Sequence, residues 1–191
     1  AAVVVTTLIS IGLGAGLANR LIKSSFRPLS VLVVLIALAG IFICISSFLY
    51  VNLTDGLEII YTKESWNDYI YQVFGLCFKI IGPPLVLMGA LFPYLLLVSE
   101  PFGQKPGQTI GHLSALNTLG SIVGSLSGCF VLLGTLGLWK SIQLIGIIYL
   151  ILAVVITSVI INIRHPQSKT AWSALAVFTL VVLGAQLYPF N

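Results

Sequence analysis

Charged side chains are scarce in this chain of 191 residues, because Asp, Glu, Lys and Arg together make up only 7% of it. A soluble domain carries about 25% charged residues, so this chain cannot cover itself with a wetted surface. Hydrophobic residues instead make up 58% of the chain, and the mean hydropathy is +1.10. We therefore expect an all-α integral membrane protein whose first partner is the lipid bilayer.

The chain is also poor in groups that carry chemistry. Its three cysteines, Cys44, Cys77 and Cys129, lie in apolar runs without His or Cys at ligand spacing, which favours neither a disulfide framework nor a metal site. We find no Ser/His/Asp set, no carboxylate pair on one membrane face and no phosphate-binding loop, so no catalytic residue and no cofactor is predicted. The net charge of +4 comes from scattered basic residues, which argues against a nucleic-acid partner.

One glycine cluster resembles a nucleotide-binding loop at first sight. Gly12, Gly14 and Gly16 follow a short valine run that could pass for a strand. A nucleotide-binding fold would place an acidic residue about 20 positions further on, but no carboxylate occurs before Asp55. The glycines also lie inside a membrane-length apolar run, so close helix packing is the favoured interpretation.

The apolar runs predict a single transmembrane domain over residues 1–191. A membrane-spanning helix needs about 20 mostly apolar residues. Six runs approach this length, so we expect a bundle of about six helices, at residues 2–19, 29–51, 74–98, 110–133, 142–163 and 171–187.

The connections between these runs differ in charge. Basic residues gather in the connections 20–28, 99–109 and 164–170, whereas the second connection is acidic, with Asp55, Glu58, Glu64 and Asp68. The positive-inside rule therefore places the three basic connections in the cytoplasm.

The predicted helix 110–133 carries the most informative pattern in the chain. Its small and polar residues at helical spacing are Asn117, Gly120, Ser121, Gly124 and Gly128. Small residues let another helix approach the backbone closely, and an asparagine in hydrocarbon requires a hydrogen-bonding partner. We predict that this face packs against another helix.

The predicted span 74–98 contains Pro83, Pro84 and Pro93, which predict kinks because proline removes a backbone hydrogen bond. Such breaks line binding sites in some transporters, but packed kinks are the favoured interpretation. Lys79 lies about 19 residues from the cytoplasmic end of this span, or about 29 Å. That depth places its ammonium group at the outer headgroups.

Three segments together resemble one family. They are Gly14-Ala-Gly-Leu-Ala-Asn-Arg20 with Arg27-Pro28-Leu29, then Leu87-Met-Gly-Ala-Leu-Phe-Pro93, and finally Gly111–Gly137 with Asn117-Thr-Leu-Gly120. Their order and spacing resemble the membrane part of bacterial fused spermidine synthase-like proteins, whose helices are related to the major facilitator superfamily. The chain departs from that pattern at Lys23, Leu91, His112 and Gly134.

The resemblance implies a half-facilitator-like bundle in a bacterial inner membrane. It also implies a further helix before residue 1 and a soluble aminopropyltransferase domain after about residue 190. The chain opens inside an apolar run, which likewise leads us to expect a preceding segment. No position here matches a catalytic residue of the family, so none is carried over.

Three functions stay open. The first is a non-catalytic anchor or accessory subunit that packs against other membrane helices, other subunits or a second copy of itself. The second is the membrane portion of an aminopropyltransferase-type enzyme whose catalytic domain lies outside this chain. The third is a facilitator-like transporter of a small molecule, although a carrier of polycations would place carboxylates near the bilayer midplane, and the sequence places none there.

Overall fold

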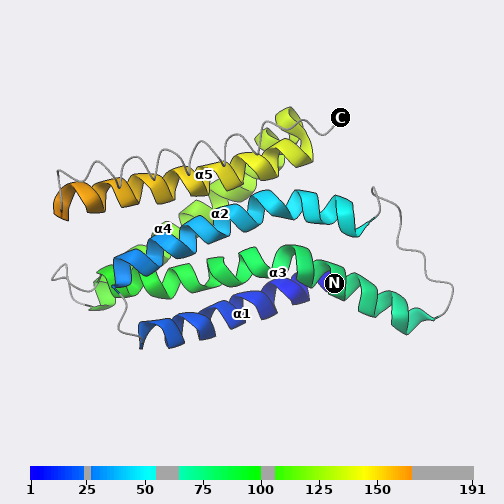
Figure 1. The fold of residues 1–191 in the computed structure, drawn as a ribbon, viewed down its shortest axis with the longest axis horizontal. Helices are drawn as coiled ribbons and strands as arrows, with labels where there is room; N and C mark the ends of the chain where they lie inside the picture. The colour runs from blue at the N-terminus through cyan, green and yellow to red at the C-terminus, as the bar shows by residue number, and fades with distance from the viewer. Residues whose placement is uncertain (24–26, 55–64, 100–105, 165–191) are drawn as a thin grey trace.

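A computed structural model describes residues 1–23, 27–54, 65–99 and 106–164, and this part of the chain is helical and contains no strand. Its elements follow one another as shown in Figure 1. They are α1 (Ala2–Ile22), α2 (Pro28–Leu53), α3 (Trp66–Ser99), α4 (Pro106–Leu126), the π-helical segment η2 (Ser127–Leu132) and α5 (Leu133–Arg164). The expected all-α architecture is confirmed for these residues.

The first two helices lie where the apolar runs predicted them. α1 ends at Ile22 and α2 begins at Pro28, so both agree with the predicted spans 2–19 and 29–51 to within a few residues. Pro28 suits the first helical position because its missing N–H has no partner there in any case. The preceding Arg27 is extended (φ −67°, ψ 122°), as a residue before proline prefers to be.

The third helix begins much earlier than predicted, at Trp66 rather than at residue 74. Ser65 stands immediately before it and acts as a cap, because its Oγ accepts a hydrogen bond from the backbone N–H of Asp68 (3.3 Å). The same hydroxyl donates to Oδ2 of Asp68 (2.7 Å). These local bonds start a helix in a stretch that its charged and aromatic residues had led us to assign to a loop.

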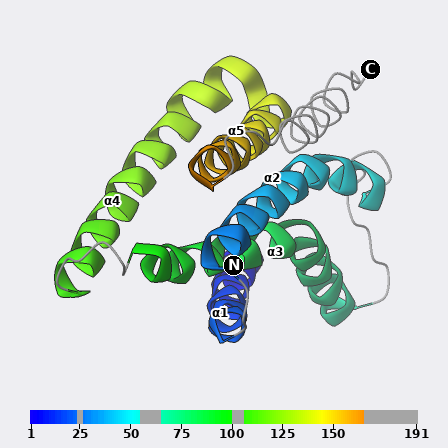
Figure 2. The same cartoon turned by 60° about the vertical axis from the view of Figure 1, so that its left-hand side comes forward.

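The predicted spans 110–133 and 142–163 are not separated by a loop. Helical structure continues from α4 through η2 into α5, and the chain reverses at Gly137, whose φ of 74° and ψ of 175° are non-helical (Figure 2). The apolar stretch Gly107–Ile160 holds 54 residues. As a straight helix at 1.5 Å per residue it would extend about 81 Å, far more than one bilayer crossing of about 30 Å.

The number of spans therefore differs from the expected six. Among the described residues, four helical stretches are long and apolar enough to cross a membrane: 2–22, 28–53, 66–99 and 107–160. The fourth stretch reverses at Gly137, so its two arms, before and after this glycine, correspond to the fourth and fifth predicted spans. The sixth predicted span, 171–187, lies outside the described residues.

Three helix pairs form the body of the bundle. α3 packs against α1 and α2, and α2 also packs against α5. Figure 1 shows α1, α3, α2 and α5 side by side. Their buried apolar residues form one cluster: Ala18, Leu32, Leu35, Ile36, Ala90, Tyr94 and Ala153. α4 stands apart, as Figure 2 shows, and contacts α3 at a few positions.

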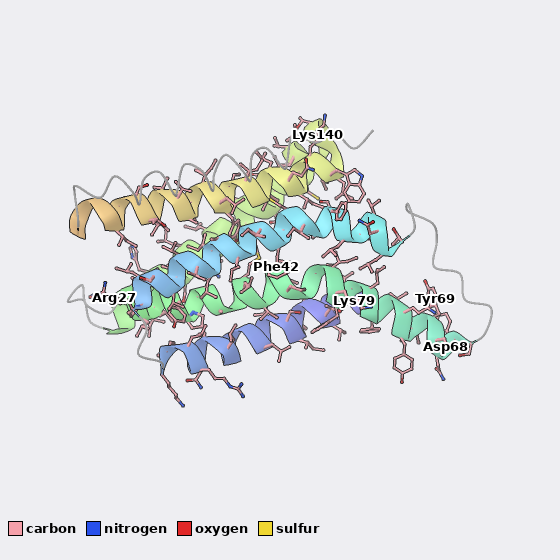
Figure 3. The ribbon with its side chains drawn as sticks, viewed as in Figure 1. Arg27, Phe42, Asp68, Tyr69, Lys79 and Lys140 are labelled. Carbon is pink, nitrogen blue, oxygen red and sulfur yellow. The ribbon has the colours of Figure 1, made fainter. Side chains whose placement is uncertain are left out.

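The helices run alternately up and down, so consecutive connections lie at opposite ends of the bundle. Arg27 of the first connection lies at one end, while Lys79, Lys140 and Asp68 lie toward the other (Figure 3). The assignment of the Arg27 end to the cytoplasm stays a prediction.

Candidate functional site

The predicted packing face of α4 is uncovered in the described part of the chain. Asn117, Gly120, Ser121 and Gly124 are all exposed on α4. A Cβ atom built on Gly120, Gly124 or Gly128 would meet nothing within 4 Å. The structure therefore places these residues on one helical stretch, and no helix of the described part of the chain covers them.

Gly128 is the last small residue of this face. It lies in η2, where the backbone is π-helical over Ser127–Leu132. A π-helical turn bonds residue i to residue i+5 and holds more residues than an α-helical turn. Because Gly128 is only the second residue of η2, it stays on the side of the helix that carries Asn117, Gly120 and Gly124.

Three hydroxyl groups along α4 donate hydrogen bonds to the helix's own backbone. Ser121 Oγ donates to the carbonyl oxygen of Asn117 (2.8 Å), and Thr118 Oγ1 donates to that of Ser114 (2.9 Å). Ser125 Oγ donates to the carbonyl oxygen of Ser121 at 2.8 Å. Such bonds let serine and threonine face an apolar neighbour without an unpaired donor. Asn117 carries two amide N–H donors and a carbonyl acceptor. Of the side chains on this face, it therefore requires the most hydrogen bonds from a partner.

Two glycines in the body of the bundle lie on small-residue faces that a neighbouring helix covers. A Cβ on Gly14 of α1 would collide with the carbonyl oxygen of Val86 in α3 and lie 3.0 Å from the backbone of Gly89. A Cβ on Gly89 would lie 2.7 Å from the carbonyl oxygen of Ile11. The two helix backbones meet here without a side chain between them.

α1 presents a complete row of small residues at this crossing. Its buried residues are Thr6, Ser10, Gly14 and Ala18, four positions apart. This spacing keeps them on one face of the helix. Close packing, the favoured interpretation of the Gly12–Gly16 cluster, is thus confirmed at Gly14, whereas a Cβ on Gly12 or Gly16 would meet nothing within 4 Å.

A second close approach joins α2 and α5. A Cβ on Gly40 would lie 2.9 Å from the side chain of Leu150 and 3.1 Å from the carbonyl oxygen of Gly146. A Cβ on Gly146 would collide with Sγ of Cys44. Sequence reasoning did not select Gly40, Gly89 or Gly146, because their spacing to other small residues on the same helix is less regular than on α4.

The three prolines lie inside one continuous helix. Pro83, Pro84 and Pro93 all fall within α3, and Figure 2 shows that the first part of α3 runs in a different direction from the rest. Pro84 is buried, and Pro83 and Pro93 are half-buried. Within the described residues they are packing positions in a bent helix.

Chemistry-bearing groups do not converge in the part of the chain that the structure describes. No group of three or more His, Cys, Asp or Glu side chains there could hold a metal ion. Cys44 and Cys77 are half-buried, whereas Cys129 is exposed. His112 is exposed near the start of α4, and Lys79 is exposed on α3. The candidate site is therefore a helix surface.

Comparison with known proteins adds no family assignment, because no protein-family model, curated protein or solved structure matches the chain. The resemblance to the membrane part of spermidine synthase-like proteins stays a prediction. The fold and composition define a helical protein with four stretches that are suited to membrane insertion among the described residues.

Proposed function

We propose that this chain is a non-catalytic membrane module that associates with another membrane helix through the face formed by Asn117, Gly120, Ser121 and Gly124, with Gly128 at its edge. In this role it acts as an anchor or an accessory subunit. The observation that carries the proposal is the contrast between the glycines of α4, which meet nothing within 4 Å, and Gly14 and Gly89, which meet a neighbouring backbone.

Helix association in a membrane depends on close packing, since lipid tails are as apolar as leucine side chains. α1 and α3 use small residues in this way, and α2 and α5 do the same. α4 carries small residues at the same type of spacing but lies away from the body of the bundle (Figure 2). A helix with such a face gains packing contacts when a second helix covers it.

Asn117 strengthens the case for a protein partner over lipid. Its exposed side-chain amide lies one turn before Gly120 and Ser121. An amide placed in hydrocarbon without hydrogen bonds costs several kcal/mol at most, and about 1–3 kcal/mol by mutational scales. A partner helix that offers a polar side chain or a backbone carbonyl removes that cost, whereas an acyl chain does not.

A transporter of polycations fits the described residues less well. Their one acidic side chain is Asp68, which is exposed in the first turn of α3, near the end of the bundle. A cationic substrate crossing the midplane would be stabilised by carboxylates there.

The membrane portion of an aminopropyltransferase-type enzyme remains the alternative, and it shares the anchoring role. Intact-mass measurement of the native polypeptide separates the two. A mass well above 20.5 kDa, with a nucleotide-binding glycine loop in the added sequence, would favour the enzyme.

The packing proposal is tested by Gly124→Leu, with Val123→Leu as the matched control at the adjacent position, which lies outside the proposed face. Both variants add bulk to exposed positions of α4, so neither should unfold the bundle. We expect the wild-type protein and Val123→Leu to migrate as an assembly after mild solubilisation of native membranes, and Gly124→Leu to dissociate. Equal migration of all three would contradict the proposal.

A further inference from the structure

The first fourteen residues of α3, Trp66–Lys79, form an amphipathic helix. Its polar row consists of Asp68, Gln72 and Lys79, with Gly75 between them, at positions i, i+4, i+11 and i+7. At 100° per residue these four positions fall within an arc of about 60°. The opposite side is apolar and aromatic, and it carries Trp66, Tyr69, Ile70, Val73, Phe74 and Cys77. Tyr71, Leu76 and Phe78 flank the polar row, so the polar strip is narrow.

This segment is only partly covered by the bundle, because Val73, Gly75, Leu76 and Cys77 are half-buried and its other residues are exposed. None of residues 66–79 is buried, and Trp66 and Tyr71 are 73% and 77% exposed. Burial begins at Ile80 and continues at Gly82, Pro84, Ala90 and Tyr94. α3 therefore has two parts, a largely exposed amphipathic part up to Lys79 and a packed part from Ile80 onward.

The length of the packed part equals one bilayer crossing. Residues 80–99 would extend about 30 Å at 1.5 Å per residue, which is the thickness of the hydrocarbon core. The whole helix of 34 residues would extend about 51 Å. The bilayer crossing therefore does not require the amphipathic part, residues 66–79.

The helix bends between the two parts. Pro83 and Pro84 lack the N–H groups that would bond to the carbonyl oxygens of Lys79 and Ile80. Figure 2 shows the first part of α3 running away from the axis of the second. In Figure 3, Lys79 lies near the end of the bundle, with Tyr69 and Asp68 beyond it.

From these observations we propose that residues 66–79 lie in the lipid headgroup region, roughly along the membrane surface, at the end of the bundle opposite Arg27. Trp66, Tyr69, Ile70, Val73 and Phe74 are immersed at the boundary of headgroups and acyl chains. Asp68, Gln72 and Lys79 face water. Tryptophan and tyrosine favour this depth because their rings are apolar and their N–H or O–H groups are polar. The partner of this surface is the bilayer interface, as for other amphipathic interfacial helices.

The proposal differs from a straight helix that projects into water. A projecting helix would leave Trp66, Ile70 and Phe74 exposed to solvent on one side, without compensation. Lying in the interface covers these side chains and keeps the polar row hydrated. The inference does not depend on α4, so it can fail while the proposed packing function holds.

A spin-label scan in proteoliposomes tests it. Full-length protein with Cys44, Cys77 and Cys129 replaced by alanine receives single cysteines at positions 67–78. Each label is then compared for its accessibility to oxygen, which concentrates in lipid, and to a water-soluble nickel chelate. We expect the ratio to oscillate with a period of 3.6 residues, lipid-exposed at 69, 70, 73 and 77 and water-exposed at 68, 72 and 75, about a constant mean depth.

Three results would overturn the proposal. Labels that are all water-exposed, or whose depth changes steadily from 78 to 67, would show a helix that projects along the membrane normal. Labels on the apolar side that are shielded from both reagents would show that protein covers this face. Ile70→Asp with a label at position 73 should move that label toward water, whereas the matched control Gln72→Asp should leave it in place.

Discussion

Gly14 of α1 and Gly89 of α3 face each other where these two helices cross. A Cβ on Gly14 would lie 3.0 Å from the carbonyl carbon of Gly89, and a Cβ on Gly89 would lie 2.8 Å from Cα of Ile11. Separations this short leave no room for a methyl group between the backbones. The α1–α3 pair therefore depends on the absence of two side chains.

The first prediction follows from that crossing. Gly14→Ala places a methyl group against the carbonyl oxygen of Val86, a backbone atom that cannot move aside cheaply. We expect a loss of about 1–3 kcal/mol in the free energy of unfolding, typical of overpacking. Gly16→Ala on the same helix meets nothing within 4 Å and should leave stability unchanged or slightly raised. Reversible unfolding in lipid bicelles compares the two, and equal stabilities would contradict the crossing.

A second prediction concerns the contact of α2 with α5. Gly146→Ala directs its new methyl group at Sγ of Cys44, so it should destabilise the protein by about 1–3 kcal/mol. Replacing Cys44 by alanine in the same protein removes that sulfur. The next atoms are then the carbonyl oxygen of Gly40 at 3.2 Å and the backbone nitrogen of Cys44 at 3.3 Å.

The double variant should therefore regain part of the lost stability. A double-mutant cycle on the free energy of unfolding measures this coupling, because residues in contact are not additive. Strict additivity of Gly146→Ala and Cys44→Ala would show that the two positions do not touch.

A third prediction concerns the reversal between α4 and α5. Gly137 has φ 74° and ψ 175°, a region that is essentially restricted to glycine. Gly137→Ala should cost about 1–3 kcal/mol of stability, although its Cβ would meet no atom within 4 Å. Gly134→Ala, three residues earlier in helical backbone, is the control and should be neutral or mildly stabilising. A thermal unfolding midpoint that does not change for Gly137→Ala would refute the strained turn.

A fourth prediction concerns Lys79. Its side chain is exposed near the end of the bundle (Figure 3), so its ammonium group reaches water or lipid headgroups. Lys79→Gln should change the free energy of unfolding by no more than about 0.5 kcal/mol, as for an ordinary surface substitution. Unfolding of the purified variant checks this, and a severe loss would place the lysine inside the membrane in contact with a partner.

The sequence predicted best what local composition determines. α1 and α2 are apolar runs. α1 ends just before a basic connection, and α2 begins just after it at a proline, so these limits were predicted to within a few residues. The predicted start of α3 was wrong because Ser65 and Asp68 are residue types typical of loops, and only the structure shows the hydrogen bonds between them. The reversal at Gly137 was expected nearby, but as a loop over 134–141 rather than as one glycine.

The sequence could not predict which glycine contacts which helix. The pairing of Gly14 with Gly89 and of Gly40 with Gly146 joins residues far apart in the chain, and spacing along one helix cannot identify its partner. The regular spacing on α4 attracted attention, yet that face is bare among the described residues. Its predicted packing stays a prediction, and so do the family resemblance and the orientation.

The central claim is that protein covers the face of α4 that carries Asn117, Gly120, Ser121 and Gly124. The most direct test is the oxygen accessibility of single spin labels along residues 116–126, measured in native-like membranes with the complete protein assembly. The account predicts low accessibility at 117, 120, 121 and 124 and high accessibility at 119, 122, 123 and 126. Uniformly high accessibility around the helix would show that lipid surrounds α4 and would contradict the account.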